Sequence, residues 1–300
     1  MRKASKLLSP IDLITVAFCL WILVYMLIGM ALGRTENASG HLPNYLSILT
    51  GVFILAWWDR SLDPVKNAGL KRILSFIRGL YPVLLFGYFF TSSYSVNRVL
   101  FGDWIDPFFY GIDHRIFGYY PSLVWAQVYN HPWTSELFHG AYFAYYPMIL
   151  GLPLYFWFKK PQAFKELIFA LTFSFYMFYF LFSLLPVVGG RFFPEAMAQT
   201  KVYWAGPFTH IMALIYNKTT HLGGGFPSSH VGITIVLTIS ALRHLRPVGY
   251  LFAVISVFLS LGIVYCQYHW FVDMLGGIIF GIIGFYLSLY VHKIILKENT

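Results

Sequence analysis

The sequence HLGGGFPSSHVGI, residues 221–233, places three glycines, a proline and two serines before a histidine and the apolar run TIVLTISALRHL. Glycines let backbone N–H groups approach an anion closely, and a helix start offers unpaired N–H donors with about half a positive charge. The stretch therefore predicts an anion-binding loop, with Gly225 among its binding residues. A glycine-rich turn with a serine cap is the alternative, but such a turn does not need the imidazole of His230.

The rest of the chain has the composition of a membrane protein. Its 300 residues are 58% hydrophobic, 20% aromatic and only 11% charged, whereas soluble domains carry about 25% charged residues. A bilayer-crossing helix needs about 20 mostly apolar residues. Eight segments qualify, near residues 11–33, 42–58, 73–93, 134–158, 163–187, 230–245, 248–267 and 271–292. We therefore expect an all-α polytopic membrane bundle of about eight transmembrane helices, whose first helix is too long to be a cleaved signal peptide.

The basic residues predict how this bundle is oriented. With eight crossings, both chain ends share one side of the membrane. That side holds 14 of the 21 Lys and Arg residues, namely Arg2, Lys3, Lys6, Arg60, Lys66, Lys71, Arg72, Lys159, Lys160, Lys165, Arg243, Arg246, Lys293 and Lys297. Because cytoplasmic loops carry the excess of Lys and Arg, we expect cytoplasmic termini and an extracytoplasmic 221–233 loop. The net charge of +9 is thus read as membrane topology, with no nucleic-acid partner expected.

The longest stretch outside the expected spans is 96–133, on the same outer side as the 221–233 loop. It is rich in Trp, Phe, Tyr and Pro and carries Asp103, Asp106 and Asp113. Aromatic side chains favour the membrane–water boundary, so we expect this segment to lie along the interface. It fits either a substrate lid or a plain connector.

A second outward motif, LLPVVGGRFFPE, residues 184–195, closes the fifth expected span. Its Arg191 follows two glycines at the membrane boundary. An arginine there can grip a phosphate with two parallel hydrogen bonds. It can equally extend to lipid head groups as a positive residue at the bilayer edge.

A third outward motif, YCQYHWFVDMLGG, residues 265–277, opens the eighth expected span. His269 and Asp273 are four residues apart, so their side chains share one helix face. The carboxylate can hold one ring N–H and leave the other nitrogen free to attack. A structural hydrogen bond or a metal pair is the alternative. If the helix count is right, all three motifs meet at one membrane face, where costly ionisable groups indicate function.

Two histidines, an arginine and a nest of N–H groups suit phosphoryl transfer, which depends on positioning and charge stabilisation. One cation about 4 Å from a phosphoryl oxygen contributes roughly 4 kcal/mol at an effective dielectric near 20. Histidine titrates near neutral pH, so within one site it can serve as a neutral nucleophile and as a charged acid.

FPSSH followed by HWFVD resembles the second and third signatures of the type 2 phosphatidic acid phosphatase superfamily. The resemblance implies a six-helix core over residues 73–300, including the interfacial segment 96–133, preceded by a two-helix extension at 1–72. It also implies a phosphohistidine mechanism on a lipid phosphate, without metal or other cofactor. The roles implied are nucleophile for His269, its orientation for Asp273, proton donation for His230, and phosphate binding for Arg191, Ser228 and Ser229.

The chain departs from the usual signatures of this family. Gly262 and Ile263 stand where the third signature has Ser-Arg, and Leu184 stands where the first signature has Lys. With PSSH in place of PSGH, these differences are similar to the branch that contains inositol phosphorylceramide synthases. Members of that branch move a phospho-headgroup, such as phosphoinositol, to an alcohol. Hydrolysis and headgroup transfer therefore both stay open, and the oligomeric state is not indicated.

Two readings from other classes compete. In the first, the chain is a lipid transporter without chemistry; transporters place ionisable groups near the bilayer midplane, whereas these groups cluster at one boundary. In the second, His230, His269 and Asp273 bind a catalytic cation. Because the covalent mechanism needs no metal, we predict that chelators have little effect.

Overall fold

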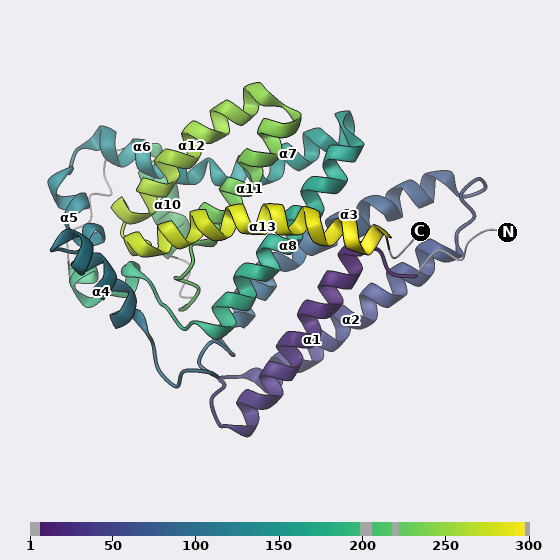
Figure 1. The fold of residues 1–300 in the computed structure, drawn as a ribbon, viewed down its shortest axis with the longest axis horizontal. Coiled ribbons are helices and arrows are strands. Elements are labelled where there is room, and N and C mark those ends of the chain that lie inside the picture. Colours follow the sequence, from purple (N-terminus) through teal and green to yellow (C-terminus); the bar gives the residue numbers. More distant parts are fainter. Residues whose placement is uncertain (1–6, 199–205, 218–221, 298–300) are drawn as a thin grey trace.

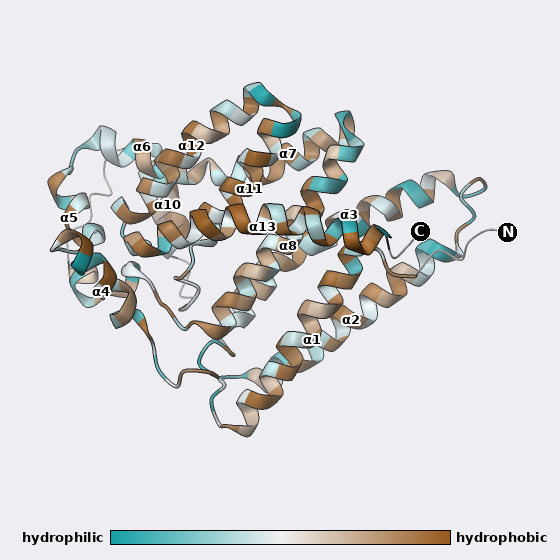
Figure 2. Cartoon of the chain, in the orientation of Figure 1, coloured by the Kyte–Doolittle hydropathy of each residue, from teal (hydrophilic) through white to brown (hydrophobic). Residues whose placement is uncertain are grey.

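The computed structural model describes residues 7–198, 206–217 and 222–297, and all regular structure within these ranges is helical. Among these described residues, five helices are long and apolar enough to cross a membrane: α1 (Pro10–Ala31), α3 (Ala68–Ser93), α8 (Pro161–Leu184), α12 (Arg246–Tyr265) and α13 (Phe271–Lys297). Figure 2 shows hydrophobic residues along these helices and hydrophilic residues gathered near helix ends and in connecting segments. The expected all-α membrane bundle is confirmed.

The second expected span is α2 (Ala38–Ser61), which is long enough to cross but less apolar than the other five. Its polar side chains pair with α3 inside the bundle. His41 Nδ1 lies 3.1 Å from the Tyr88 hydroxyl, and the Tyr45 hydroxyl lies 2.7 Å from Ser92 Oγ. These contacts attach α2 to α3, while the division into a 1–72 extension and a 73–300 core stays a prediction.

The fourth expected span is two helices, α6 (Pro132–Phe143) and α7 (Tyr145–Lys159), which meet at Ala144. The cause is Pro147. Proline has no N–H to donate to the carbonyl four residues earlier, here Phe143, and its ring crowds that carbonyl. The helical hydrogen-bond pattern is therefore interrupted at this point, although Ala144 keeps right-handed helical backbone angles.

The sixth expected span is α11 (Ser229–His244), with only 16 residues. At 1.5 Å per residue it extends about 24 Å, less than the roughly 30 Å hydrocarbon core of a bilayer. It packs against α7, α8, α12 and α13, and its first residues are buried. The loop before α11 therefore enters the bundle, where irregular backbone is tolerated because protein surrounds it.

The connecting segments contain further short helices. The 96–133 segment forms α4 (Asp106–Phe117) and α5 (Pro121–Val128), and beyond α8 come η1 (Gly190–Phe192), α9 (Pro194–Ala198) and α10 (Pro207–Asn217). In Figure 1, α4 and α5 lie at the left end with the start of α13, while α1 begins near the other end of α13. The 96–133 segment is thus placed beside the loops that carry the sequence motifs.

The core is centred on α8 and is rich in aromatic side chains. Phe18 of α1 stacks on Tyr176 of α8 with ring centroids 4.6 Å apart. Near the start of α1, Arg78 pairs with both Asp12 and Asp59. This ion-pair network joins α1, α2 and α3 at the end of the bundle opposite the motif loops.

Candidate active site

Two loops pack backbone against backbone at the motif end of the bundle, one before Arg191 and one before α11. The Gly225 N–H donates to the Val187 carbonyl at 2.8 Å. A Cβ at Gly225 would lie 2.9 Å from both the Val187 oxygen and the Gly189 nitrogen. Gly189 itself has φ +90°, which favours glycine. The glycines of both motifs therefore allow the two loops to touch.

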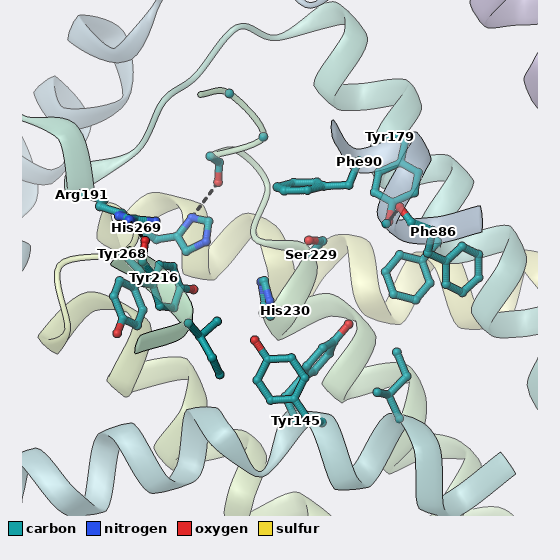
Figure 3. Close-up of a pocket in the computed structure, with 18 of the residues that line it drawn as sticks. Phe86, Phe90, Tyr145, Tyr179, Arg191, Tyr216, Ser229, His230, Tyr268 and His269 are labelled. Atoms are coloured by element: carbon teal, nitrogen blue, oxygen red, sulfur yellow. Dashed lines mark hydrogen bonds between the residues drawn. The ribbon is translucent and has the colours of Figure 1, made fainter. Parts of the chain in front are cut away.

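The ring of His269 is held through one nitrogen. Its Nδ1 lies 2.8 Å from the Gly225 carbonyl oxygen and 3.3 Å from Asp273 Oδ2 (Figure 3). A carbonyl and an ionised carboxylate only accept hydrogen bonds, so Nδ1 carries a proton, and in the neutral imidazole the lone pair is therefore on Nε2. The expected contact with Asp273 is present, and the backbone carbonyl supplies a second, shorter one.

Asp273 lies behind His269 and is fully buried. Its Oδ2 also accepts from the Trp270 N–H at 2.9 Å, which closes the first turn of α13. Its backbone carbonyl accepts from the Ser228 N–H at 3.0 Å, which ties the 222–228 loop to α13. The side chain of Ser228 is fully buried and is not among the described residues that line the cavity at this site.

His230 lies in the first turn of α11, in contact with two tyrosine rings. The centroid of its ring is 5.0 Å from that of Tyr142 and 4.8 Å from that of Tyr145. His230 and His269 line the same cavity, as Figure 3 shows. The two imidazoles are therefore placed on one side of the bundle, as the sequence predicts.

Arg191 lies in η1, at the edge of the same cavity. Its guanidinium stands over the rings of Tyr216 and Phe192, 4.6 Å and 4.9 Å from their centroids, and donates to the Tyr216 carbonyl. Figure 3 shows Arg191 beside His269. Stacking on two aromatic faces and a hydrogen bond to a carbonyl hold the guanidinium at this edge of the cavity. Tyr216 belongs to α10, a helix that hydropathy did not predict.

The cavity has a volume of about 460 Å³ and two chemically different ends. Its polar side chains are those of Arg191, Ser229, His230 and His269, with the backbone of the glycines 223–225 also in the lining. The apolar end is lined mainly by aromatic and aliphatic side chains of α3, α7 and α8, among them Phe86, Phe90, Ile149, Phe175 and Tyr179. Figure 3 shows Phe86, Phe90 and Tyr179 away from the pair formed by Arg191 and His269. This arrangement suits an amphipathic ligand with an anionic head.

The structure thus brings Arg191, Gly225, Ser229, His230 and His269 to one cavity, with Asp273 directly behind. Within the described residues, no group of three or more His, Cys, Asp or Glu side chains is arranged to hold a metal ion. The alternative of a cation site built from the two histidines and Asp273 therefore gains no support from their geometry.

The sequence showed Asp106 and Asp113 but gave no indication of their hydrogen-bond partners at the site. Asp106 accepts hydrogen bonds from the backbone of the Arg191 loop and from the indole of Trp270. Asp113 accepts from the Phe271 and Val272 N–H groups at 2.7 and 3.0 Å. Burial raises the pKa of the Asp113 carboxyl, against the opposing effect of these two hydrogen bonds. The available signal was the seven-residue spacing, which puts both carboxylates on one helix face.

Comparison with known families gives a match over the site and its helices. A family model described as the PAP2 superfamily matches residues 108–287, more than half of the chain. The matched region includes Arg191, His230, His269 and Asp273. Searches of curated proteins and of solved structures found no match.

Proposed function

Because the chain belongs to the PAP2 superfamily, the family of the type 2 phosphatidic acid phosphatases, we propose that it transfers the phosphoryl group of a membrane lipid phosphate through a phosphohistidine. Superfamily membership supports a phosphatase- or phosphotransferase-type enzyme acting on lipid phosphates. The observation that carries the finer proposal is the ring of His269. Its Nδ1 faces two acceptors, so the neutral ring has its lone pair on Nε2, and the ring lines a cavity shared with Arg191 and His230.

In the first step, Nε2 of His269 attacks phosphorus and forms an N–P bond. The P–O bond to the lipid breaks, and the leaving oxygen takes a proton from the imidazolium of His230. The positive charge that develops on His269 is stabilised by Asp273 and by the Gly225 carbonyl, both at Nδ1. The products are the lipid alcohol and a phosphoryl group on His269.

In the second step, water or an alcohol attacks the phosphohistidine. His230, now neutral, accepts the proton of the attacking hydroxyl as the N–P bond breaks. Attack by water releases inorganic phosphate, and attack by an alcohol gives a new phosphoester. The two outcomes share the same intermediate, so the acceptor alone decides between phosphatase and phosphotransferase.

The phosphate is held at the polar end of the cavity. Arg191, Ser229 and the backbone of Gly223 and Gly224 line the cavity and supply donors for the charge that spreads over the equatorial oxygens in the transition state. Gly225 contributes by its close approach to the Val187 loop, because its own N–H already donates to the Val187 carbonyl. Ser228 acts indirectly, because its backbone N–H fixes the loop to Asp273. The proposal needs neither a metal ion nor an organic cofactor.

The apolar end of the cavity favours a lipid over a soluble phosphate ester. It lies between α3 and α7, which both pack on α8. Each buried methylene contributes about 0.8 kcal/mol, so four methylenes fewer on the substrate chain cost roughly 3 kcal/mol, or about 200-fold in kcat/KM. A lipid phosphate fits both ends, since its head carries the charge and its chain is apolar.

We also propose that the termini face the cytoplasm and the site faces outward. The proposal is supported by the excess of Lys and Arg on the termini side. Reporter fusions at residue 300 test it, because alkaline phosphatase is active only outside the cytoplasm and green fluorescent protein fluoresces mainly inside. An active alkaline phosphatase fusion would reverse the orientation.

The decisive experiment uses purified protein, lipids with ³²P in the phosphate, and the variant His269→Ala. The control variant is His114→Ala, whose exposed side chain lies outside the cavity. We expect an acid-labile, base-stable ³²P label on the wild-type protein and on the control but not on His269→Ala, which should lose turnover.

Product analysis with candidate alcohols present then identifies the acceptor. Release of free phosphate alone indicates a phosphatase, and a labelled phosphoester product indicates a phosphotransferase. Full turnover by His269→Ala would overturn the covalent mechanism, and lipid movement without cleavage would favour the transporter.

A further inference from the structure

The helix α4 meets both site loops through its carboxylates. Asp106 opens the helix, and its Oδ2 accepts from the Val188 N–H at 2.8 Å. Its Oδ1 accepts from the Gly189 N–H at 2.8 Å and from Trp270 Nε1 at 3.2 Å. Val188 and Gly189 lead directly to Arg191, and Trp270 follows His269 in the chain. One carboxylate therefore joins the loop that carries the arginine to the loop that carries the histidine.

Asp106 is not among the described residues that line the cavity. It therefore does not contact a phosphate bound there, and its negative charge would oppose such an anion if it did. Its three donors engage both carboxylate oxygens and take up three of the roughly four lone-pair sites of the group. Any effect of Asp106 on the reaction must pass through the two loops.

We propose that Asp106 is a positioning residue, which sets the distance between the guanidinium of Arg191 and Nε2 of His269. The inference rests on the phosphoryl transfer proposed above and adds a residue from the interfacial segment to it. The segment 96–133 is then neither a lid nor a plain connector. It acts as a brace, by which we mean that α4 holds the loop that carries Arg191 and the loop that carries His269 in a fixed relative position.

The second carboxylate of α4 supports this role. Asp113 lies two turns after Asp106, on the same helix face, and accepts from the N–H groups of Phe271 and Val272. A carboxylate at a helix start satisfies N–H groups that have no partner within the helix. Asp113 thereby fixes the first turn of α13, which carries Asp273. The two carboxylates of one helix thus hold the three residues that follow His269.

A backbone hydrogen bond also joins the start of α4 to the Arg191 loop. The N–H of Ile105, directly before α4, donates to the Pro186 carbonyl at 3.0 Å. The start of α4 and the segment 186–189 are therefore joined by a backbone hydrogen bond as well as by the side chain of Asp106. This backbone bond survives any side-chain substitution, so a variant of Asp106 should keep α4 in place and loosen only the site.

The test compares Asp106→Asn and Asp106→Ala with Asp103→Ala, purified and assayed with labelled lipid phosphate. Asn has nearly the same shape, but its NH₂ group would face an N–H donor. Asp103 lies three residues earlier, before α4 begins, is exposed, and accepts from the N–H of Trp104 at 2.7 Å, so its variant serves as the control. We expect kcat to fall about 10–100-fold in the Asp106 variants, since a misplacement of about 1 Å costs on the order of 100-fold.

Inhibition by orthovanadate separates positioning from loss of fold. Vanadate adopts the five-coordinate geometry of phosphoryl transfer and therefore requires His269 and Arg191 at the correct separation. We expect its inhibition constant to rise about as much as kcat falls. The KM for the lipid and the inhibition constant of inorganic phosphate should change less than threefold, because the cavity walls are untouched.

Two results would overturn the positioning role. One is wild-type kcat in both Asp106 variants, and the other is a lower kcat with unchanged vanadate inhibition, which reports only a smaller folded fraction. If neither variant folds, Trp270→Phe removes one of the three donors, and the role fails if its kcat and vanadate inhibition are unchanged. Loss of activity in His269→Ala together with full activity in Asp106→Ala would refute the brace alone, whereas an active His269→Ala refutes the proposed reaction.

Discussion

Replacement of Gly225 by alanine tests whether the contact between the two loops aims the nucleophile. The backbone of Gly225 donates to the Val187 carbonyl and accepts from His269 Nδ1, both at 2.8 Å. Its φ angle is not in the left-handed region, so alanine is compatible with the backbone conformation. The added methyl group is therefore the only perturbation.

The size of the effect follows from the packing. The Cβ would lie 2.9 Å from the Gly189 nitrogen and 2.9 Å from the Val187 oxygen, whereas ordinary contact begins at 3.4 Å. Both neighbours are backbone atoms, so the loops must separate by about half an ångström. Overpacking of this kind costs roughly 1–3 kcal/mol of stability. A shift of half an ångström at the His269 acceptor should reduce kcat by about tenfold, by scaling from about 100-fold for 1 Å.

The assay is the steady-state kinetics of Gly225→Ala on labelled lipid phosphate, with a thermal melt of the purified protein. Gly51→Ala is the matched control, because the Cβ of residue 51 would meet no atom within 4 Å. We expect a lower melting temperature and a tenfold lower kcat for Gly225→Ala, and neither change for the control. A kcat equal to wild type, with the melting temperature lowered, would refute the proposal that loop packing sets the position of the His269 ring.

Three further predictions follow from other parts of the structure. Gly87→Trp, on α3 at the cavity, should raise the KM for long-chain lipid phosphates at least tenfold and leave the KM for short-chain ones unchanged, because a Cβ at residue 87 meets no atom within 4 Å and the indole can enter the cavity. The control Gly151→Trp lies outside the cavity and should change neither KM. If KM depends on lipid chain length equally in the two variants, the lipid chain does not bind in this cavity. Arg78→Met leaves the carboxylate of Asp12, which is 1% exposed, without its cation. The free energy of unfolding, measured by denaturation, should therefore fall by about 3–5 kcal/mol. Adding Asp12→Leu should restore part of this stability, and a double variant as unstable as Arg78→Met would contradict the pairing argument. Incubation with EDTA should leave kcat within a factor of two, and activity that is lost to EDTA and restored by a divalent cation would favour the metal reading.

The parts of the site that were predictable lie in short motifs. His269 and Asp273 are four apart on a helix, and a helix fixes the relation between such neighbours whatever surrounds them. His230 and Ser229 were predictable because the glycines before them indicate a loop that ends at a helix start. The family resemblance, now confirmed by the match over residues 108–287, rests on these same local patterns.

The parts that were not predictable depend on contacts between distant segments. Asp106 meets Val188 and Trp270, 82 and 164 positions away, and nothing in the local sequence of α4 indicates those partners. Hydropathy also missed α10, because its 11 residues are too few to span a bilayer. The break between α6 and α7 was readable in principle from Pro147, but an average over an apolar window hides a single proline.

The two acceptors at Nδ1 of His269 have a consequence for genetics. One of them is the main-chain oxygen of residue 225, which every amino acid possesses, so no codon change deletes it. A protein that loses the Asp273 side chain still has this oxygen to fix the tautomer of the imidazole. A screen for loss-of-function alleles should therefore return His269 and His230 as complete inactivations and Asp273 as a partial one.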